Sequence, residues 1–243
     1  MAVGGLYISW RIRQMVLPFV RVYGQWVEEP IIPMSGQLER MANAVEEEAY
    51  DNLTSEPVGD DYLSDGSQEA EEANEIGLSF YENISSMYQA TLNLFSAGLF
   101  HVAEHHLADI TRDGGIRKPV SNTYLKDVVE WYAKNCQLDL KQFPSWSVIE
   151  ELRLVANTTK HAEGSAAKRL RETHPELFLY PSLREEYADT TIFVSPLSLP
   201  LGGDGLYVTG DEFRAYHKAV LGFFEWLKQY FEGHGDEYFP RCG

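Results

Sequence analysis

Cysteine is scarce in this chain: Cys136 and Cys242 are the only two among its 243 residues. Two thiols are too few for the disulfide framework of a small secreted protein, and the chain has no C-x-x-C pair. We expect Cys136 to be a buried thiol and Cys242 to be an exposed residue of the tail. A reducing cytoplasm is the location that this cysteine content favours.

Long hydrophobic runs are also missing, even near the aromatic-rich N-terminus. Arg11, Arg13 and Arg21 interrupt the apolar stretches there, so no secretory signal is expected. No run approaches the roughly 20 apolar residues that span a bilayer. We interpret residues 1–43 as an N-terminal docking segment of short helical pieces, because Pro18 should break any long helix. An amphipathic segment on a membrane surface is the alternative for this stretch, although we expect no membrane partner.

Positive charge is absent from a long part of the chain. No Lys or Arg lies between Arg40 and Arg112, whereas fifteen acidic residues do. This gap supplies nearly all of the net charge of −17. From Arg112 to Arg184 the balance reverses, with twelve Lys and Arg against nine Asp and Glu. The overall acidity argues against a protein that coats nucleic acid nonspecifically, but the basic part can still bind a phosphate.

The sequence lacks the fingerprints of the common α/β enzymes. It has no G-x-S-x-G, no Walker sequence and no Rossmann glycine pattern. Apolar residues instead recur at helical spacing over residues 76–111, which predicts one long early helix. Further helices are expected over 122–137 and 210–232, and a capping box, Thr209-Gly-Asp-Glu212, opens the last one. We therefore predict a mainly α fold, a helical bundle that a C-terminal helix closes.

Two stretches depart from this helical pattern. Residues 44–75 are dense in acidic residues, Ser and Gly, and we interpret them as an acidic linker or mobile loop. Residues 190–208 combine β-forming side chains with a Gly-rich turn, which predicts a small β-ribbon or an extended arm. The predicted organisation is thus a docking segment over 1–43, a linker over 44–75 and one helical domain over 76–243.

One histidine cluster raises the question of a metal. His101 and His105 are four residues apart, and Asp109 extends the same row. A metal hydrolase built on these three side chains is one alternative for the function. However, the spacing lacks the glutamate of H-E-x-x-H, and no further ligand follows at a suitable distance. We therefore predict no metal and no cofactor, and we interpret the histidines as polar residues of a helix face or an interface.

The most informative stretch is the helix predicted over residues 147–163. Ser147 and Glu150 have the spacing of a capping box, and Gly164 stands where a glycine ends a helix. One stripe of this helix is apolar and is expected to face the core. Its members are Val148, Leu152, Val155 and Thr159.

The opposite side of the same helix carries Arg153, Asn157 and His161, each four residues from the last. A cation, an amide and a titratable imidazole in one row can bind an anion and transfer a proton near neutral pH. We take these three side chains as candidate catalytic residues. Three further cations are candidates for substrate binding: Lys160, Arg117 and Lys118. The alternative is a polar helix face that only meets solvent.

A helical bundle with a long early helix, followed by a helix with Arg and then His on its polar face, resembles the HEPN superfamily. The resemblance covers roughly residues 76–180, and its motif runs from Arg153 to His161. Seven residues separate this pair, where the family motif is Arg-x(4–6)-His, and Leu154 stands where a polar residue is common. Asn157 can take that polar role one turn later. The surrounding stretch, ELRLVANTTKHAEGSAAKRLR, also resembles segments of uncharacterised bacterial proteins.

The resemblance implies a metal-independent endoribonuclease of the kind found in toxin–antitoxin and antiviral systems, with RNA as its substrate. His161 would then move a proton of the 2′-hydroxyl or of the leaving 5′-oxygen, Arg153 would stabilise the phosphate charge, and Asn157 would orient the phosphate or the imidazole. The resemblance also implies a homodimer, because the family's sites form where two motif helices meet. The alternative is a HEPN-like module without activity, which binds a protein partner or acts as a scaffold in a defence or regulatory complex.

Overall fold

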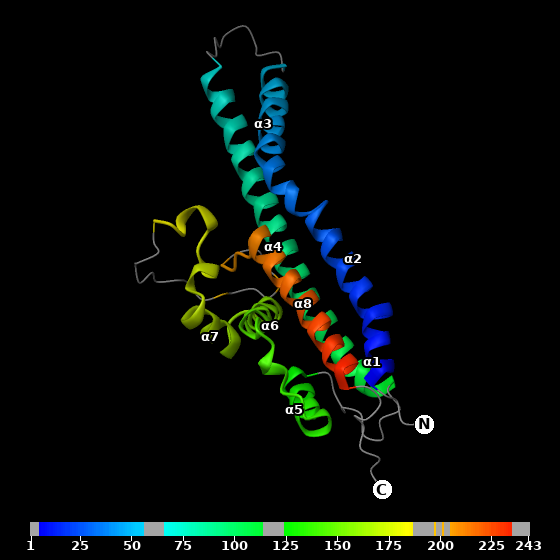
Figure 1. Cartoon of the computed structure of the whole chain (residues 1–243). Helices are drawn as coiled ribbons and strands as arrows, with labels where there is room; N and C mark the ends of the chain where they lie inside the picture. The colour runs from blue at the N-terminus through cyan, green and yellow to red at the C-terminus, as the bar shows by residue number, and fades with distance from the viewer. Residues whose placement is uncertain are drawn as a thin grey trace.

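The computed structural model describes residues 5–55, 66–113, 124–186, 197, 201 and 205–234. Within these ranges every regular element is a helix and none is a β-strand, which confirms the predicted mainly α fold (Figure 1). None of the described helices is both long enough and apolar enough to cross a membrane.

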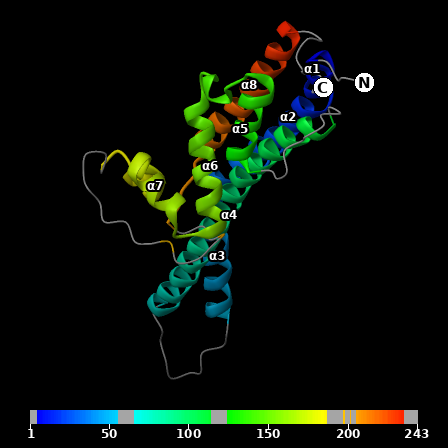
Figure 2. The same cartoon turned by 90° about the horizontal axis from the view of Figure 1, so that it is seen from below.

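The long early helix is α4, which runs from Ser67 to Asp113 and is the spine of the molecule. Its C-terminal half is buried in the body of the protein, where α2, α6 and α8 pack around it (Figures 1 and 2). Leu92, Leu99 and Phe100 contribute to this core. Its N-terminal half leaves the body and pairs with α3 (Leu38–Ser55) in a two-helix projection. We call this projection the acidic arm.

The acidic arm corrects the interpretation of residues 44–75 as a linker or loop. Residues 44–55 and 67–75 are helical, and residues 56–65 lie outside the described part of the chain. A thin buried seam joins the two helices, made of Leu38, Ala42 and Ala73. The composition was misleading because the acidic side chains cover the outer faces, while Glu and Ala are good helix formers.

The N-terminal stretch is helical almost throughout. It forms α1 (Gly5–Arg11), a π-helical turn (Ile12–Val16), α2 (Leu17–Glu28) and a 3-10 turn (Ile32–Gln37) before α3. The prediction that Pro18 breaks a long helix was wrong, because Pro18 occupies the first turn of α2 directly after the π turn. A proline in a first turn loses no hydrogen bond that the helix needs. As predicted, the stretch packs on the main body, chiefly on α8 and α4.

The closing helix is α8 (Gly210–His234), and its predicted capping box is confirmed. Glu212 accepts a hydrogen bond from the Thr209 backbone N–H at 2.7 Å, and the Thr209 hydroxyl accepts one from the Glu212 N–H at 3.2 Å. Most of the β-ribbon or extended arm predicted near 190–208 lies outside the described residues. Its described part, 205–208, is not a strand, because side chains of α4 satisfy its backbone: Asn93 Nδ2 donates to the Leu206 carbonyl at 2.8 Å.

Two shorter helices complete the body, α5 (Leu125–Cys136) and α7 (Ser165–Thr173). Three further 3-10 turns lie in this part of the chain, at Leu140–Gln142, Pro175–Phe178 and Pro181–Leu183. Cys136 is buried as predicted, and this burial raises the pKa of its thiol to about 12. Cys242 lies outside the described residues.

Candidate functional site

Helix α6 (Trp146–His161) carries the predicted polar row and packs against α4 and α8. Of its predicted core stripe, Leu152, Val155 and Thr159 are buried. Val148 is only partly buried, because Ile149 occupies the inward position in the first turn. The polar side of α6 therefore faces away from the core, as its spacing predicts.

The predicted capping box at the start of α6 is wrong. The helix begins before Ser147, its N-cap residue is Ser145, and no side chain caps it. Glu150 instead accepts a hydrogen bond from Arg153 Nε at 2.9 Å, in an ion pair three residues along the helix. The same spacing thus serves the polar row rather than the helix end.

The other end of α6 also differs from the prediction. The residue that leaves the helix is Ala162, with φ of 53° and ψ of −128°, and Gly164 instead precedes α7. A positive φ is strained for a residue that has a Cβ. This strained turn directly follows His161, and backbone strain of this kind is concentrated at functional sites.

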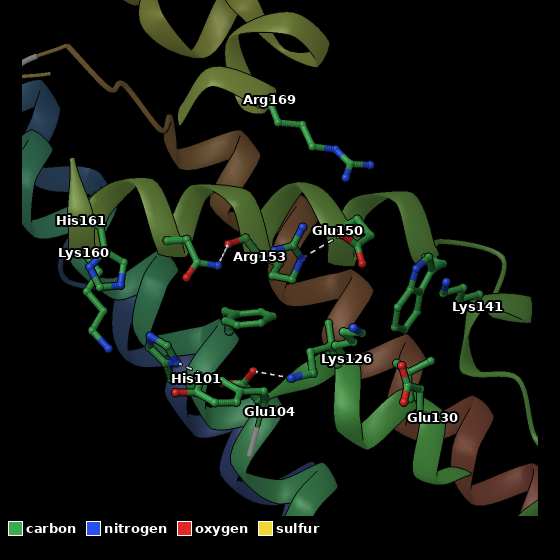
Figure 3. A pocket seen from close by; sticks show the side chains of 16 residues that line it. His101, Glu104, Lys126, Glu130, Lys141, Glu150, Arg153, Lys160, His161 and Arg169 are labelled. Atoms are coloured by element: carbon green, nitrogen blue, oxygen red, sulfur yellow. Dashed lines mark hydrogen bonds and ion pairs between the residues drawn. The ribbon is translucent and has the colours of Figure 1, made fainter. Parts of the chain in front are cut away.

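The polar side of α6 lines a pocket of about 900 Å³ between α6 and the facing parts of α4 and α5 (Figure 3). We call it the groove. Arg153, Asn157, Lys160 and His161 all line it, whereas Arg117 and Lys118 lie outside the described residues. Its other lining residues are Phe100, His101 and Glu104 of α4; Tyr124, Leu125, Lys126, Val129 and Glu130 in and before α5; Lys141; Trp146 and Glu150 of α6; and Arg169 of α7.

The groove is basic although the protein is strongly acidic. Five cations line it, namely Lys126, Lys141, Arg153, Lys160 and Arg169, against the three carboxylates of Glu104, Glu130 and Glu150. Within the described part of the chain, four of these cations form no ion pair, and only Arg153 does. Amino and guanidinium groups without a carboxylate partner are available to bind an anion.

Two members of the polar row are already engaged along the helix. Arg153 donates its Nε–H to Glu150, and Asn157 donates from Nδ2 to the Arg153 carbonyl oxygen at 2.8 Å. These contacts fix the direction of both side chains. A guanidinium has five N–H donors, so the terminal nitrogens of Arg153 stay available. His161, at the end of the helix, is exposed.

The histidine cluster of α4 is divided between two faces. His101 lines the groove, with Nδ1 3.5 Å from a carboxylate oxygen of Glu104. His105 does not line the groove, and its Nε2 lies 3.0 Å from an oxygen of Asp109. In the described residues, no group of three His, Cys, Asp or Glu side chains is arranged to hold a metal ion. His101 of α4 therefore lines the groove together with the polar row of α6, and it does not share a site with His105.

An ion pair holds α7 against the end of α6 and so presents Arg169 to the groove. Arg171 donates two hydrogen bonds to Glu163, at 2.7 and 2.6 Å. These bonds lower the pKa of Glu163 and raise the pKa of Arg171. A smaller hollow of about 450 Å³ on the α7 side shares Arg153, Asn157, His161 and Arg169 with the groove, so the polar row is accessible from two sides.

Sequence reasoning found one wall of the groove and missed the others. Lys126, Lys141, Arg169 and His101 come from four separate elements, and no spacing along the chain relates them to α6. The only sequence signal for these residues was the excess of basic residues after Arg112. That excess does not predict which of the basic side chains lie close together in the fold. The chain matches no protein-family model, no curated protein and no solved structure.

Proposed function

We propose that the groove binds the phosphodiester backbone of RNA and cleaves it without a metal, as a HEPN-like endoribonuclease. The observation that carries this proposal is the convergence of Arg153, Lys160 and His161 with three cations of other elements on one pocket, in a chain of net charge −17. A cleft lined by positive side chains attracts anionic ligands, even in a protein whose net charge is negative.

The chemistry uses the ribose itself as the nucleophile. One imidazole accepts the proton of the 2′-hydroxyl, and the 2′-oxygen forms a bond to phosphorus. The bond between phosphorus and the 5′-oxygen breaks, and a second acid donates a proton to that oxygen. The products are a 2′,3′-cyclic phosphate and a 5′-hydroxyl. Arg153 stabilises the negative charge that builds on the phosphate oxygens, through its terminal nitrogens.

His101 supplies the second proton-transfer group in this scheme. It enters the groove from α4, opposite His161 at the end of α6 (Figure 3). Glu104 is closest to Nδ1 of His101, which leaves Nε2 as the nitrogen for the substrate. With one imidazole from each wall, a single protomer holds both an acid and a base. Lys126, Lys160 and Arg169 then bind the flanking phosphates.

One observation favours a second candidate, a HEPN-like module that binds without cleaving. Arg153 Nε is paired with Glu150, and Asn157 Nδ2 is bonded to a backbone carbonyl, so these two nitrogens are engaged before any ligand arrives. In that case the groove would bind the phosphate groups of a partner and leave them intact.

Cleavage of a labelled RNA by the purified full-length chain in EDTA separates the two candidates. The proposal expects products that end in a 2′,3′-cyclic phosphate, and at least a hundredfold slower cleavage by His161→Ala and by His101→Ala, since acid–base groups contribute roughly 10²–10⁴-fold. His105→Ala is the matched control, because it lies one turn from His101 and outside the groove.

Three outcomes would remove the assignment. The first is wild-type RNA cleavage that EDTA abolishes, and the second is cleavage that His161→Ala leaves unchanged. The third, binding of RNA with no cleavage at any pH, would support the binding module instead.

A further inference from the structure

Large apolar side chains lie on the outward side of the stretch from α1 to α2 as well as on its inward side. Inward side chains such as Ile8, Ile12 and Val20 are buried in the core. On the outward side, seven large apolar side chains are each between 41% and 63% exposed. They are Leu6, Tyr7, Trp10, Met15, Phe19, Val22 and Trp26. We call these seven side chains the apolar stripe.

The apolar stripe is too large to be ordinary surface. Single exposed apolar side chains are normal, but a contiguous patch above a few hundred Å² marks an interaction site. Within the stripe, Tyr7 stacks on Trp10 with centroids 5.8 Å apart, and at its edge Trp26 lies 6.4 Å from Phe95 of α4. At on the order of 100 Å² exposed for each of the seven side chains, the stripe offers roughly 700 Å², which is close to the roughly 800 Å² that one partner buries in a stable interface.

We propose that the apolar stripe is a homodimer interface, covered by the stripe of a second copy that runs antiparallel about a two-fold axis near Val16. A two-fold axis at this position places Leu6 opposite Trp26 of the second copy, and Trp10 opposite Val22. Four of the seven side chains then pair with one another, and Met15 lies beside its own mate at the axis, as an isologous contact requires. The face is self-complementary in shape as well, because Val22 and Trp26 line a hollow of about 470 Å³ that can receive Trp10.

The exposed charges on this face are basic, so they offer a second copy no complementary carboxylate, and it is the rest of the chain that disfavours a membrane. Between Gly5 and Val27 the chain has no acidic residue, and Arg13 and Arg21 are exposed. In the antiparallel pairing, Arg13 lies opposite Phe19, where a guanidinium interacts favourably with a ring face. An anionic lipid surface would instead repel the rest of this acidic chain, whose net charge is −17.

This interface would leave the two grooves apart. In Figure 1, α4 and α8 lie between α2 and α6, and each of them contacts both helices. A dimer through the stripe therefore has one groove on each outer side, each built from a single chain. This arrangement differs from the composite site that the HEPN resemblance implies, and it does not rest on the proposed function.

Sedimentation and light scattering on the full-length chain test the interface. The wild type is expected at twice the 27.7 kDa of one chain at micromolar concentration. Phe19→Glu combined with Val22→Glu should raise the concentration of half-dimerisation at least tenfold, because it places buried charges in the interface. Both side chains are more than half exposed, so the fold, followed by circular dichroism, should not change. Met87→Glu, at an exposed apolar position on α4, is the matched control.

Cross-linking with a short bis-maleimide tests the orientation, in a Cys242→Ser background. Met15→Cys lies next to the proposed axis, so two copies should be joined. Leu6→Cys should not be joined, since its mate lies about 30 Å away along the helices. A parallel pairing would join both variants equally and overturn the proposal. So would a wild type that stays monomeric at 100-fold higher concentration, a dimer that the Glu variants leave intact, or a monomer that floats with phosphatidylserine vesicles.

Discussion

The groove and the acidic arm lie at opposite ends of helix α4, and they differ in the sign of their charge and in the size of the core that supports them. At the C-terminal end of α4, five cations and two imidazoles line a hollow against a large core. At the N-terminal end, α3 and the first half of α4 carry acidic side chains, and Arg40 is the single Lys or Arg among the described residues of this arm. Only a thin seam joins them there.

This difference shows that net charge is a poor guide to a binding site. A value of −17 describes the whole chain, yet its negative charge is concentrated in the arm and around it. Exposed charges further apart than a Debye length of about 8–10 Å are largely screened from each other. The groove can therefore attract an anion while the protein as a whole remains acidic.

The largest expected effect concerns the core that supports the groove. Leu152→Ala removes a fully buried side chain from the inward face of α6, and it should lower the free energy of unfolding by about 3 kcal/mol, through lost burial and a cavity. Urea denaturation followed by circular dichroism measures this change. A loss below 1 kcal/mol would mean that α6 is only loosely attached to the body.

Reversing charge in the groove should have the next largest effect. Lys126→Glu combined with Lys160→Glu should weaken the binding of a 2′-O-methyl RNA roughly 100-fold at low salt, because two phosphate contacts are lost and two repulsions are gained. The matched control is Lys168→Glu with Lys218→Glu, which makes the same charge change at exposed positions outside the groove. If both pairs of substitutions weakened binding equally, RNA binding would depend on the net charge of the protein and not on the groove.

A substitution in the arm should act on the arm alone. At Gly77, a Cβ would lie 2.8 Å from Cβ of Glu46, which is a close approach of α4 to α3. Gly77→Ala should separate the two helices and lower the local free energy of opening of the arm by about 1 kcal/mol. This loss corresponds to roughly fivefold faster hydrogen exchange of the α3 amides. Amides of α6 and RNA binding should stay within twofold of wild type. Changes in α6 would show that the two regions are coupled.

The smallest effect concerns the pH dependence of the ion pair beside the groove. Hydrogen bonds from Arg171 lower the pKa of Glu163 below 4.5 in the folded protein. A depressed carboxyl pKa stabilises the fold above the unfolded pKa, and this contribution is lost as pH falls through the folded value. Glu163→Gln should therefore cost up to about 1 kcal/mol at pH 7, and less as the pH falls below 4.5. An unfolding free-energy difference that grows toward acid would contradict this sign.

Much of the fold follows from periodicity. The spacing of apolar residues predicted α4, and the Thr209–Glu212 capping box located the start of α8. The sequence did not predict the acidic arm, because its composition is that of a solvated loop. Its buried seam is also narrow, since it consists of one leucine and two alanines. Pattern reasoning is strong for wide apolar faces and weak for narrow ones.

The candidate site was only partly predictable for a different reason. Arg153, Asn157 and His161 share one helix face, which spacing reveals. Lys126, Lys141 and Arg169 reach the same groove from other elements, and only tertiary packing brings them there. The spacing of Ser147 and Glu150 was misread, because an i, i+3 pair fits both a capping box and a helix surface.

The most direct test of the groove as a phosphodiester site is the salt dependence of binding of a short 2′-O-methyl RNA to the wild-type chain. Four cations of the groove form no ion pair in the described part of the chain. At about 0.7 per phosphate contact, we expect log Kd to rise with log salt at a slope of roughly 3. A slope near zero, or no binding at millimolar protein in low salt, would contradict the proposal.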